Sequence, residues 1–309
     1  MDDVEFPGQP DTREPGMPEH LSTFHEKLSR YQTPTITDSI CCWTDLLGFG
    51  SDLYGAKWEP SEALWISIFN RITEAHRDCY RKLDLLTEFA LTLNDGIVRC
   101  CDLANIDHID RLSMWFRECI LTHNRINERE QRQQLPGART VLAHGKKLIH
   151  GPSELTVEDF VLNYTKLDPS GPSRLPRKVA ERIVASNPEP LQLNLAFSKA
   201  YILDRLGSRG GIKGGHFYID EGVLQAIAHF AKTKPHLRAP IDREEGTSRL
   251  FAIPRQDDEY SQDDEYFHLG FRLQLPRISI NTTEIETSVY RVVEFYPWDE
   301  PLPFTLPVV

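Results

Sequence analysis

The sequence lacks the features that would place it in a membrane or in a secretory pathway. No stretch approaches about 18 consecutive apolar residues, so no transmembrane helix is predicted. Residues 1–16 are acidic and proline-rich and contain no apolar run, which is not the pattern of a signal peptide. We therefore expect a cytoplasmic protein that has no membrane partner.

Cysteine spacing and net charge exclude two further classes. The six cysteines include two adjacent pairs but no C-x-x-C spacing, so buried free thiols are expected rather than a zinc site or a disulfide framework. The net charge is −11, from 35 basic and 46 acidic residues, which argues against nucleic acid as a partner. Most of this negative charge comes from residue 240 onward, where 14 acidic residues accompany six Arg and no Lys.

The order of the hydrophobic patterns predicts the core fold. Strands show apolar runs or period-two alternation, and helices show apolar residues three or four positions apart. The expected elements are a strand at 38–44, a helix at 60–79, a hairpin of strands at 88–94 and 96–101, a helix around 109–120, and a strand with a hairpin at 138–151. This β-α-β-β-α-β order predicts an α+β, ferredoxin-like domain with helices packed on one face of an antiparallel sheet.

The remaining segments complete a three-part organisation. Residues 1–34 are expected to form a tail with a short helix at 18–31, residues 35–235 the core domain, and residues 236–309 an acidic, β-rich appendage without chemistry of its own. Within the core domain, residues 165–190 read as a proline-rich loop. They precede a helix at 190–207, a strand at 215–219 and a helix at 220–232.

Two aspartates occupy positions that this topology brings together. Asp45 ends the first strand and Asp95 lies at the Asn-Asp-Gly tip of the hairpin, two places that are neighbours in a β-α-β-β unit. Two close carboxylates repel each other unless they are protonated or bridged by cations. Mg²⁺ and Mn²⁺ are the usual cations, and a pair of them suits phosphoryl or nucleotidyl transfer. The alternative is that both aspartates serve only as cap and turn residues.

A glycine-rich segment follows the first of these aspartates. Gly48-Phe49-Gly50-Ser51 is expected to form a loop whose backbone N–H groups approach a polyphosphate. This expectation agrees with a metal-dependent reaction at Asp45.

Four motifs in order resemble those of the class III nucleotidyl cyclases over roughly residues 38–220. Residues 43–50, "WTDLLGFG", resemble the first metal motif, and Asp95 with its preceding "LN" resembles the second. Residues 139–145, "RTVLAHG", are similar to the Arg-x-Gly-Ile-x-x-Gly strand of the family, and residues 193–196, "LNLA", to its Val-Asn-x-Ala helix. The resemblance implies that residues 35–235 form a cyclase catalytic domain.

The resemblance implies a head-to-tail homodimer with active sites at the interface and two Mg²⁺ or Mn²⁺ ions in each. The 3′-hydroxyl of a nucleoside triphosphate would attack the α-phosphorus and release pyrophosphate. The implied site residues are Asp45, Asp95 and the Leu46 carbonyl for the metals, Gly48, Phe49, Gly50 and Arg139 for the phosphates, and Asn194 of the partner subunit for the ribose.

The sequence departs from the family at two positions. Leu91 stands where purine-specific members carry Lys or Glu, and leucine cannot hydrogen-bond to a purine edge. Ser198 stands at the position of the transition-state arginine, and either Lys199 or Arg205 could replace it, with Lys199 taken as the first candidate. Tyr54 is a candidate for the aromatic residue that fills the pocket of a smaller base.

This combination is similar to the stand-alone pyrimidine cyclases of bacterial Pycsar anti-phage systems, which make cyclic UMP or cyclic CMP. The resemblance implies a pyrimidine nucleoside triphosphate as substrate, without deciding between UTP and CTP. Three alternatives stay open: an adenylate or guanylate cyclase with an unusual pocket, a catalytically silent dimeric scaffold, and an oligonucleotide-forming enzyme of the GGDEF type, whose signature sequence is missing.

Overall fold

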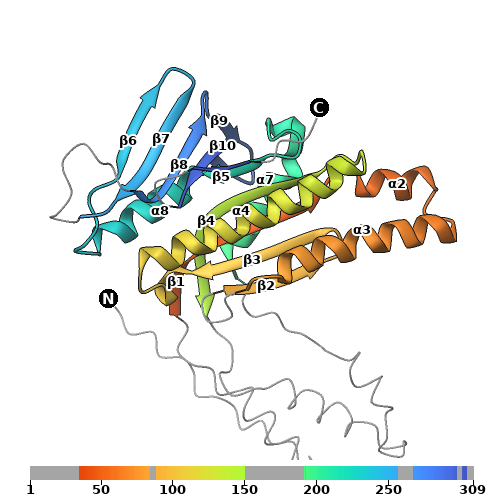
Figure 1. The fold of residues 1–309 in the computed structure, drawn as a ribbon, viewed down its shortest axis with the longest axis horizontal. Coiled ribbons are helices and arrows are strands. Elements are labelled where there is room, and N and C mark those ends of the chain that lie inside the picture. Colours follow the sequence, from red (N-terminus) through yellow and green to blue (C-terminus); the bar gives the residue numbers. More distant parts are fainter. Residues whose placement is uncertain are drawn as a thin grey trace, which may run out of the picture. The chain divides into compact units, whose positions relative to one another are not determined.

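A computed structural model of the chain describes residues 35–83, 88–149, 191, 193–256, 267–297 and 301–304. The helix expected at 18–31 and the loop expected at 165–190 lie outside these residues. The first six major elements confirm the predicted β-α-β-β-α-β order (Figure 1). They are β1 (Thr35–Leu46), α3 (Glu62–Tyr80), β2 (Glu88–Leu93), β3 (Gly96–Asp102), α4 (Ile109–Arg132) and β4 (Ala138–Ile149).

The strands of this core have the order β2-β3-β1-β4, which is that of a ferredoxin-like sheet. β3 lies antiparallel between β2 and β1, with Cys41 opposite Cys100 and Leu91 opposite Val98. This register places the β2–β3 turn beside the end of β1, because β3 begins at Gly96 directly opposite Asp45.

The sheet is mixed and longer than predicted. β5 (Phe217–Asp220) pairs parallel to β4, so the expectation of a purely antiparallel sheet is wrong at this edge. The C-terminal region is rich in strands, as predicted, and because β10 (Glu286–Tyr296) pairs with β5 these strands continue the core sheet. The other strands of this region are β6 (Ile241–Glu245), β7 (Ser248–Pro254), β8 (Phe267–Gln274), β9 (Ile278–Asn281) and β11 (Leu302–Pro303).

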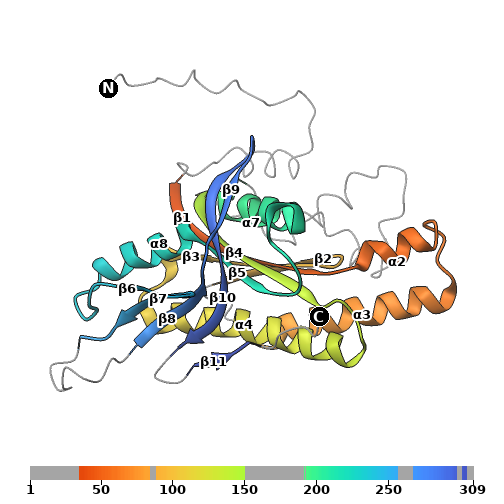
Figure 2. The same ribbon diagram turned by 90° about the horizontal axis from the view of Figure 1, so that it is seen from above.

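Helices cover both faces of the sheet, whereas the sequence analysis placed them on one. Successive side chains of a strand point to opposite faces, and β1 separates its apolar residues accordingly. Ile40 and Cys42 pack with α4 and with α8 (Glu221–Lys232), whereas Cys41 and Trp43 pack with α7 (Leu195–Leu206). Figure 2 shows α7 on the opposite side of the strands from α3 and α4.

The buried surface explains why these helices form where the periodicity predicts. Ile68, Ala75 and Cys79 are the apolar residues of the buried stripe of α3, and burying a side chain of the size of Ile68 stabilises the fold by about 1.5–3 kcal/mol. All six cysteines are buried and free, which confirms the prediction from their spacing. Within the described part of the chain, no helix is both long and apolar enough to span a membrane.

Candidate active site

Asp45 is the penultimate residue of β1, and its side chain lies on the face of the sheet that α7 covers. It follows Cys41 and Trp43 at two-residue intervals, so it shares their side of the sheet. Trp43 packs so closely on β3 that a Cβ atom at Gly96 would lie 2.6 Å from its ring. Only glycine fits at that position, and this close approach brings the hairpin tip against the end of β1.

Asp95 lies in that tip, next to Asp45. Asn94 turns the chain with a φ of 58°, a conformation that asparagine tolerates better than most residues. The Leu46 N–H donates to the Asp95 carbonyl at 3.3 Å, and Asp45 is the strand partner of Gly96. The structure therefore brings the two predicted acidic residues to neighbouring positions, although metal binding at them stays a prediction.

The two carboxyls share an environment that disfavours their ionised forms. Burial raises the pKa of Asp45 to about 8, the Asp204 and Asp95 carboxylates raise it as well, and the Arg139 and Arg71 guanidiniums oppose them. Burial also raises the pKa of Asp95, which Asp204 reinforces and Arg71 counteracts. Asp45 therefore holds a proton at neutral pH in the metal-free chain, and a bound cation would displace it.

The available donors suit a hard divalent cation. Asp45 and Asp95 offer carboxylate oxygens, and the backbone carbonyl of Leu46 is the third predicted donor. Among the residues that the structure describes, no group of three or more His, Cys, Asp or Glu side chains could hold a metal by itself. Mg²⁺ and Mn²⁺ are commonly bound by one or two carboxylates together with water and substrate phosphates, so this small donor set fits them.

The glycine-rich segment differs from the expected loop. A two-residue turn at 47–48 leads directly into the short helix α2 (Phe49–Gly55). Gly48 has a φ of 74°, and a Cβ atom there would lie 2.9 Å from Pro136 Cγ, so glycine is required on both grounds. Phe49 is buried, and Gly50 lies in the first turn of α2. The predicted phosphate contacts of these residues stay untested.

Arg139 lies in β4 on the same face of the sheet as Asp45, but its guanidinium already forms hydrogen bonds with other residues of the same chain. Its Nε donates to Asp204 Oδ1 at 2.6 Å, and Nη2 donates to the Asp204 carbonyl at 2.9 Å. Nη1 donates to the Ile212 carbonyl at 3.4 Å. Both side chains are largely buried, so a triphosphate would have to use the remaining N–H groups or displace this pair.

The predicted ribose and transition-state residues also have partners within the chain. Asn194 is buried and caps α7, accepting from the Phe197 N–H at 3.1 Å, so the helix begins at Leu195 and not at residue 190. Lys199 donates to Asp220 at 2.7 Å. Asn194 therefore lies at the N-terminal cap of α7 and Lys199 within the helix, and their predicted roles remain predictions.

The two residues predicted to line the base pocket, Leu91 and Tyr54, differ in how far they are buried. Leu91 is half-buried and packs against the apolar cluster beneath α7. Tyr54 lies on α2 and is 77% exposed, so it does not enclose a pocket within one chain. Their predicted contact with a base is untested.

Three charged residues near the site were missed in the sequence analysis. Arg71 of α3, Glu130 of α4 and Asp204 of α7 are all buried. Each lies on the apolar stripe of its helix, as Arg71 does between Ile68 and Ala75. A charged residue on a buried stripe was the available signal, because such a side chain needs a partner inside the protein.

Comparison with known proteins finds similarity only among solved structures. No family model matches the chain, and no curated protein matches it. The adenylyl cyclase CyaB from P. aeruginosa is 10% identical with a TM-score of 0.35, over 85% of this chain and 96% of that chain. The dimeric guanylyl cyclase domain of the RhoGC fusion protein from the aquatic fungus Blastocladiella emersonii is 10% identical with a TM-score of 0.34, over 84% and 96%. Similarities this low carry no argument about the reaction.

Proposed function

We propose that this chain is a nucleotidyl cyclase that converts a nucleoside triphosphate into a 3′,5′-cyclic monophosphate and pyrophosphate. The observation that carries the proposal is the convergence of Asp45 and Asp95 at one end of the sheet, joined by the hydrogen bond from the Leu46 N–H to the Asp95 carbonyl. The sequence motifs that resemble class III cyclases support the same reaction.

In the proposed reaction Asp45, Asp95 and the Leu46 carbonyl would hold two Mg²⁺ or Mn²⁺ ions. Bound divalent ions favour ionisation of an attacking hydroxyl and neutralise the leaving phosphates. Gly48, which adopts a left-handed conformation, lets the backbone turn beside Asp45 at a point where a Cβ atom would collide with Pro136.

We further propose a pyrimidine as the base, in the manner of the Pycsar anti-phage cyclases. Leu91 lies on β2 four residues before Asp95, and its side chain has no donor or acceptor with which to read a purine edge. A cyclic pyrimidine nucleotide would then serve as a second messenger in defence against phage. UTP and CTP are both candidate substrates.

A homodimer is the proposed active form. Four aromatic side chains on or beside α2 and α3 are more than half exposed, namely Tyr54, Trp58, Trp65 and Phe69. Exposed apolar side chains that gather in this way often mark a protein interface. Sedimentation of the wild type and of the W65S/F69S variant tests this step, and a wild type that stays monomeric at working concentration would contradict it.

Turnover of the four nucleoside triphosphates tests the function directly. Purified protein is incubated with an equimolar mixture and Mn²⁺, the products are identified by mass spectrometry, and D45N and D95N serve as controls. Cyclic UMP or cyclic CMP, absent in both variants, is the expected result. Cyclic AMP or cyclic GMP alone would overturn the pyrimidine assignment. A dinucleotide would indicate the oligonucleotide-forming alternative, and no product at all the silent scaffold.

A further inference from the structure

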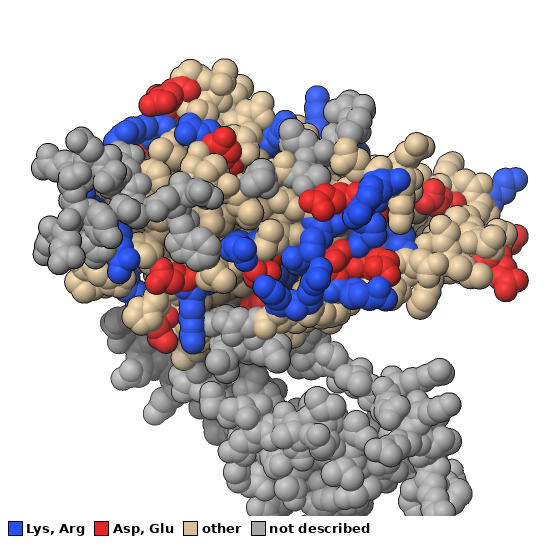
Figure 3. All heavy atoms as spheres, viewed as in Figure 1, with Lys and Arg blue, Asp and Glu red and all other residues tan. Residues whose placement is uncertain are grey.

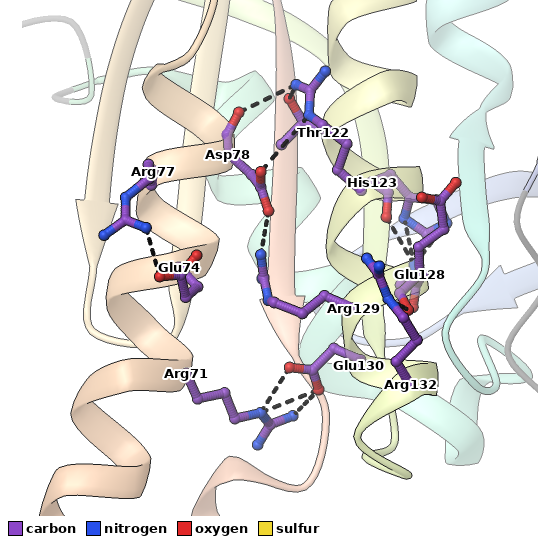
Figure 4. Close-up of polar contacts among 12 residues, drawn as sticks. Arg71, Glu74, Arg77, Asp78, Thr122, His123, Glu128, Arg129, Glu130 and Arg132 are labelled. Atoms are coloured by element: carbon purple, nitrogen blue, oxygen red, sulfur yellow. Dashed lines mark hydrogen bonds and ion pairs between the residues drawn. The ribbon is translucent and has the colours of Figure 1, made fainter.

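A buried ion pair between α3 and α4 reaches the segment that follows Asp45. Arg71 Nε donates to both carboxylate oxygens of Glu130, at 3.0 and 3.1 Å, and Nη2 donates to Glu130 Oε2 at 2.6 Å. Figure 4 shows the two side chains pointing toward each other from facing helices. Their side chains are 6% and 0% exposed, so the pair is isolated from solvent.

The same guanidinium has a partner outside the pair. Arg71 Nη2 also donates to the backbone carbonyl of Leu47 at 2.7 Å. On its other side, the Leu47 N–H donates to the Gly137 carbonyl at 2.8 Å, and the preceding N–H of Leu46 donates to the Asp95 carbonyl. The backbone from Leu46 to Leu47 is therefore fixed by three hydrogen bonds, and Arg71 supplies the one that comes from a charged donor.

A buried ion pair is a poor means of stabilising a fold, because desolvation of the two charges offsets much of their attraction. Its location is therefore informative. Leu47 lies two residues after Asp45 and one after Leu46, two of the proposed metal donors, and it precedes Gly48, whose φ of 74° turns the chain into α2. Holding the Leu47 carbonyl fixes the peptide plane from which this turn starts.

Another buried pair in the chain provides a matched comparison. Arg99 Nε and Nη2 each donate to Glu88 at 2.7 Å, and those side chains are 2% and 1% exposed. Arg99 also donates to the Lys82 carbonyl at 3.4 Å, and Trp115 donates to Glu88 at 3.0 Å. None of these partners belongs to the segment 45–50.

We propose that Arg71, oriented by Glu130, is a positioning residue that holds the segment Asp45–Gly48 in the conformation required for metal binding. The inference rests on the proposed function, since it concerns the same donors. Arg71 is not itself a ligand, because it acts through the Leu47 carbonyl.

The test compares R71K with R99K. Lysine keeps the charge but cannot bond Glu130 and the Leu47 carbonyl through a planar fork. Amide hydrogen exchange at Leu46 and Leu47 is expected to be at least about ten-fold faster in R71K than in the wild type, and unchanged in R99K. Mn²⁺ affinity, measured from free Mn²⁺ by electron paramagnetic resonance, is expected to fall by about 10- to 100-fold in R71K only.

E130Q, which keeps the shape of the side chain and loses its charge, is the second variant in case R71K fails to fold, and it should change both readouts in the same direction. Unaltered exchange at Leu46 and Leu47 in R71K and E130Q, or an equal effect in R99K, would overturn the inference. If the wild type binds Mn²⁺ and R71K binds it with the same affinity, the inference is wrong while the proposed function still stands. A wild type that neither binds Mn²⁺ nor cyclises any triphosphate would overturn the proposed function and this inference together.

Discussion

The Arg71–Glu130 and Arg99–Glu88 pairs have nearly the same chemistry in different surroundings. Both join a guanidinium to a carboxylate through Nε and Nη2, and both are almost completely buried. They differ in their further partners. The first pair bonds the Leu47 carbonyl, two residues after Asp45, whereas the second bonds the Lys82 carbonyl and the Trp115 indole, which lie outside the segment 45–50. The positioning role proposed for Arg71 therefore follows from the backbone segment that it contacts, and the geometry of the ion pair alone would not indicate it.

The surface around these pairs makes the contrast clearer. Figure 3 shows basic and acidic side chains interleaved on the face where α3 and α4 lie. Ion pairs there join Arg77 to Glu74 and Arg129 to Asp78, and the Arg77–Glu74 pair is largely exposed to solvent. Such exposed pairs contribute little to stability, so only the buried pairs are informative about positioning.

The largest expected effect comes from removing one partner of a buried pair. R71M and R99M each leave a buried carboxylate without its counter-charge, and we expect a loss of about 3–5 kcal/mol in the free energy of unfolding. Glu88 keeps the hydrogen bond from Trp115, so R99M should lie at the lower end of this range and R71M at the upper end. Urea denaturation measures both values.

The double variants R71M/E130L and R99M/E88L serve as controls. Each replaces both charges by apolar groups, which should return most of the stability that the single variant loses. If the two double variants recover stability but retain equal turnover, the two pairs are functionally equivalent and the contrast between them is wrong.

Asp45→Asn tests whether the end of β1 is the reactive end. We expect turnover to fall by at least about 100-fold, because a proposed metal donor loses its charge. The stability of the variant should stay equal or rise, since a carboxyl whose pKa is raised by burial and by like charges is replaced with a neutral group. Turnover assays and thermal unfolding of the same preparation check both parts. A variant that is fully active would contradict the placement of the site.

The dependence of stability on pH should be the same in R71K and R99K, because it comes from groups other than the two ion pairs. Burial lowers the pKa of His123 to about 3 and that of His216 to about 4. The imidazoles of these two histidines bind more protons in the unfolded chain below pH 6.5, so their contribution to stability falls as the pH decreases from about 6.5 to about 4. Asp45, whose pKa is raised to about 8, contributes in the opposite direction over the same range, and it does so equally in both variants. For His123 the slope is about 1.4 kcal/mol per pH unit, and His216 adds a smaller amount because it is partly exposed. Denaturation midpoints at pH 7.5, 6 and 5 measure the slope in R71K and R99K, which should agree.

The smallest expected effect comes from a variant that weakens α3 without changing Arg71. The Ser61 hydroxyl caps α3 by accepting from the Leu64 N–H at 3.3 Å. S61A should lower stability by about 1 kcal/mol and leave Mn²⁺ affinity unchanged, since the contact between Arg71 and Leu47 is retained. A drop in Mn²⁺ affinity comparable with that of R71K would show that any weakening of α3 disturbs the site.

The sequence predicted the local part of the fold well. Strand alternation, helical stripes and the Asn-Asp-Gly turn determine the order β-α-β-β-α-β, and each depends on residues close together in the chain. The parallel pairing of β5 with β4 and the junction of β10 with β5 were not predicted. Such pairings join segments far apart in sequence, and local periodicity carries no information on which strands meet.

The candidate site divides in a similar way. The neighbouring positions of Asp45 and Asp95 follow from hairpin geometry, so they could be expected from the sequence. The engagement of Arg139 by Asp204, and of Arg71 by Glu130 and Leu47, depends on which helix faces lie opposite each other in three dimensions. A charged residue on an apolar stripe indicates that a buried partner exists, but the sequence pattern does not identify that partner.

The seam between β5 and β10 has a consequence for how the polypeptide matures on the ribosome. Tyr218, Ile219 and Asp220 lie opposite Arg291, Tyr290 and Val289, so the edge of β5 that faces away from β4 has no partner strand until residues 289–291 have emerged. A bare strand edge can pair with other chains. Nascent protein that stalls before this point would expose that edge to aggregation, however well its N-terminal elements had already folded.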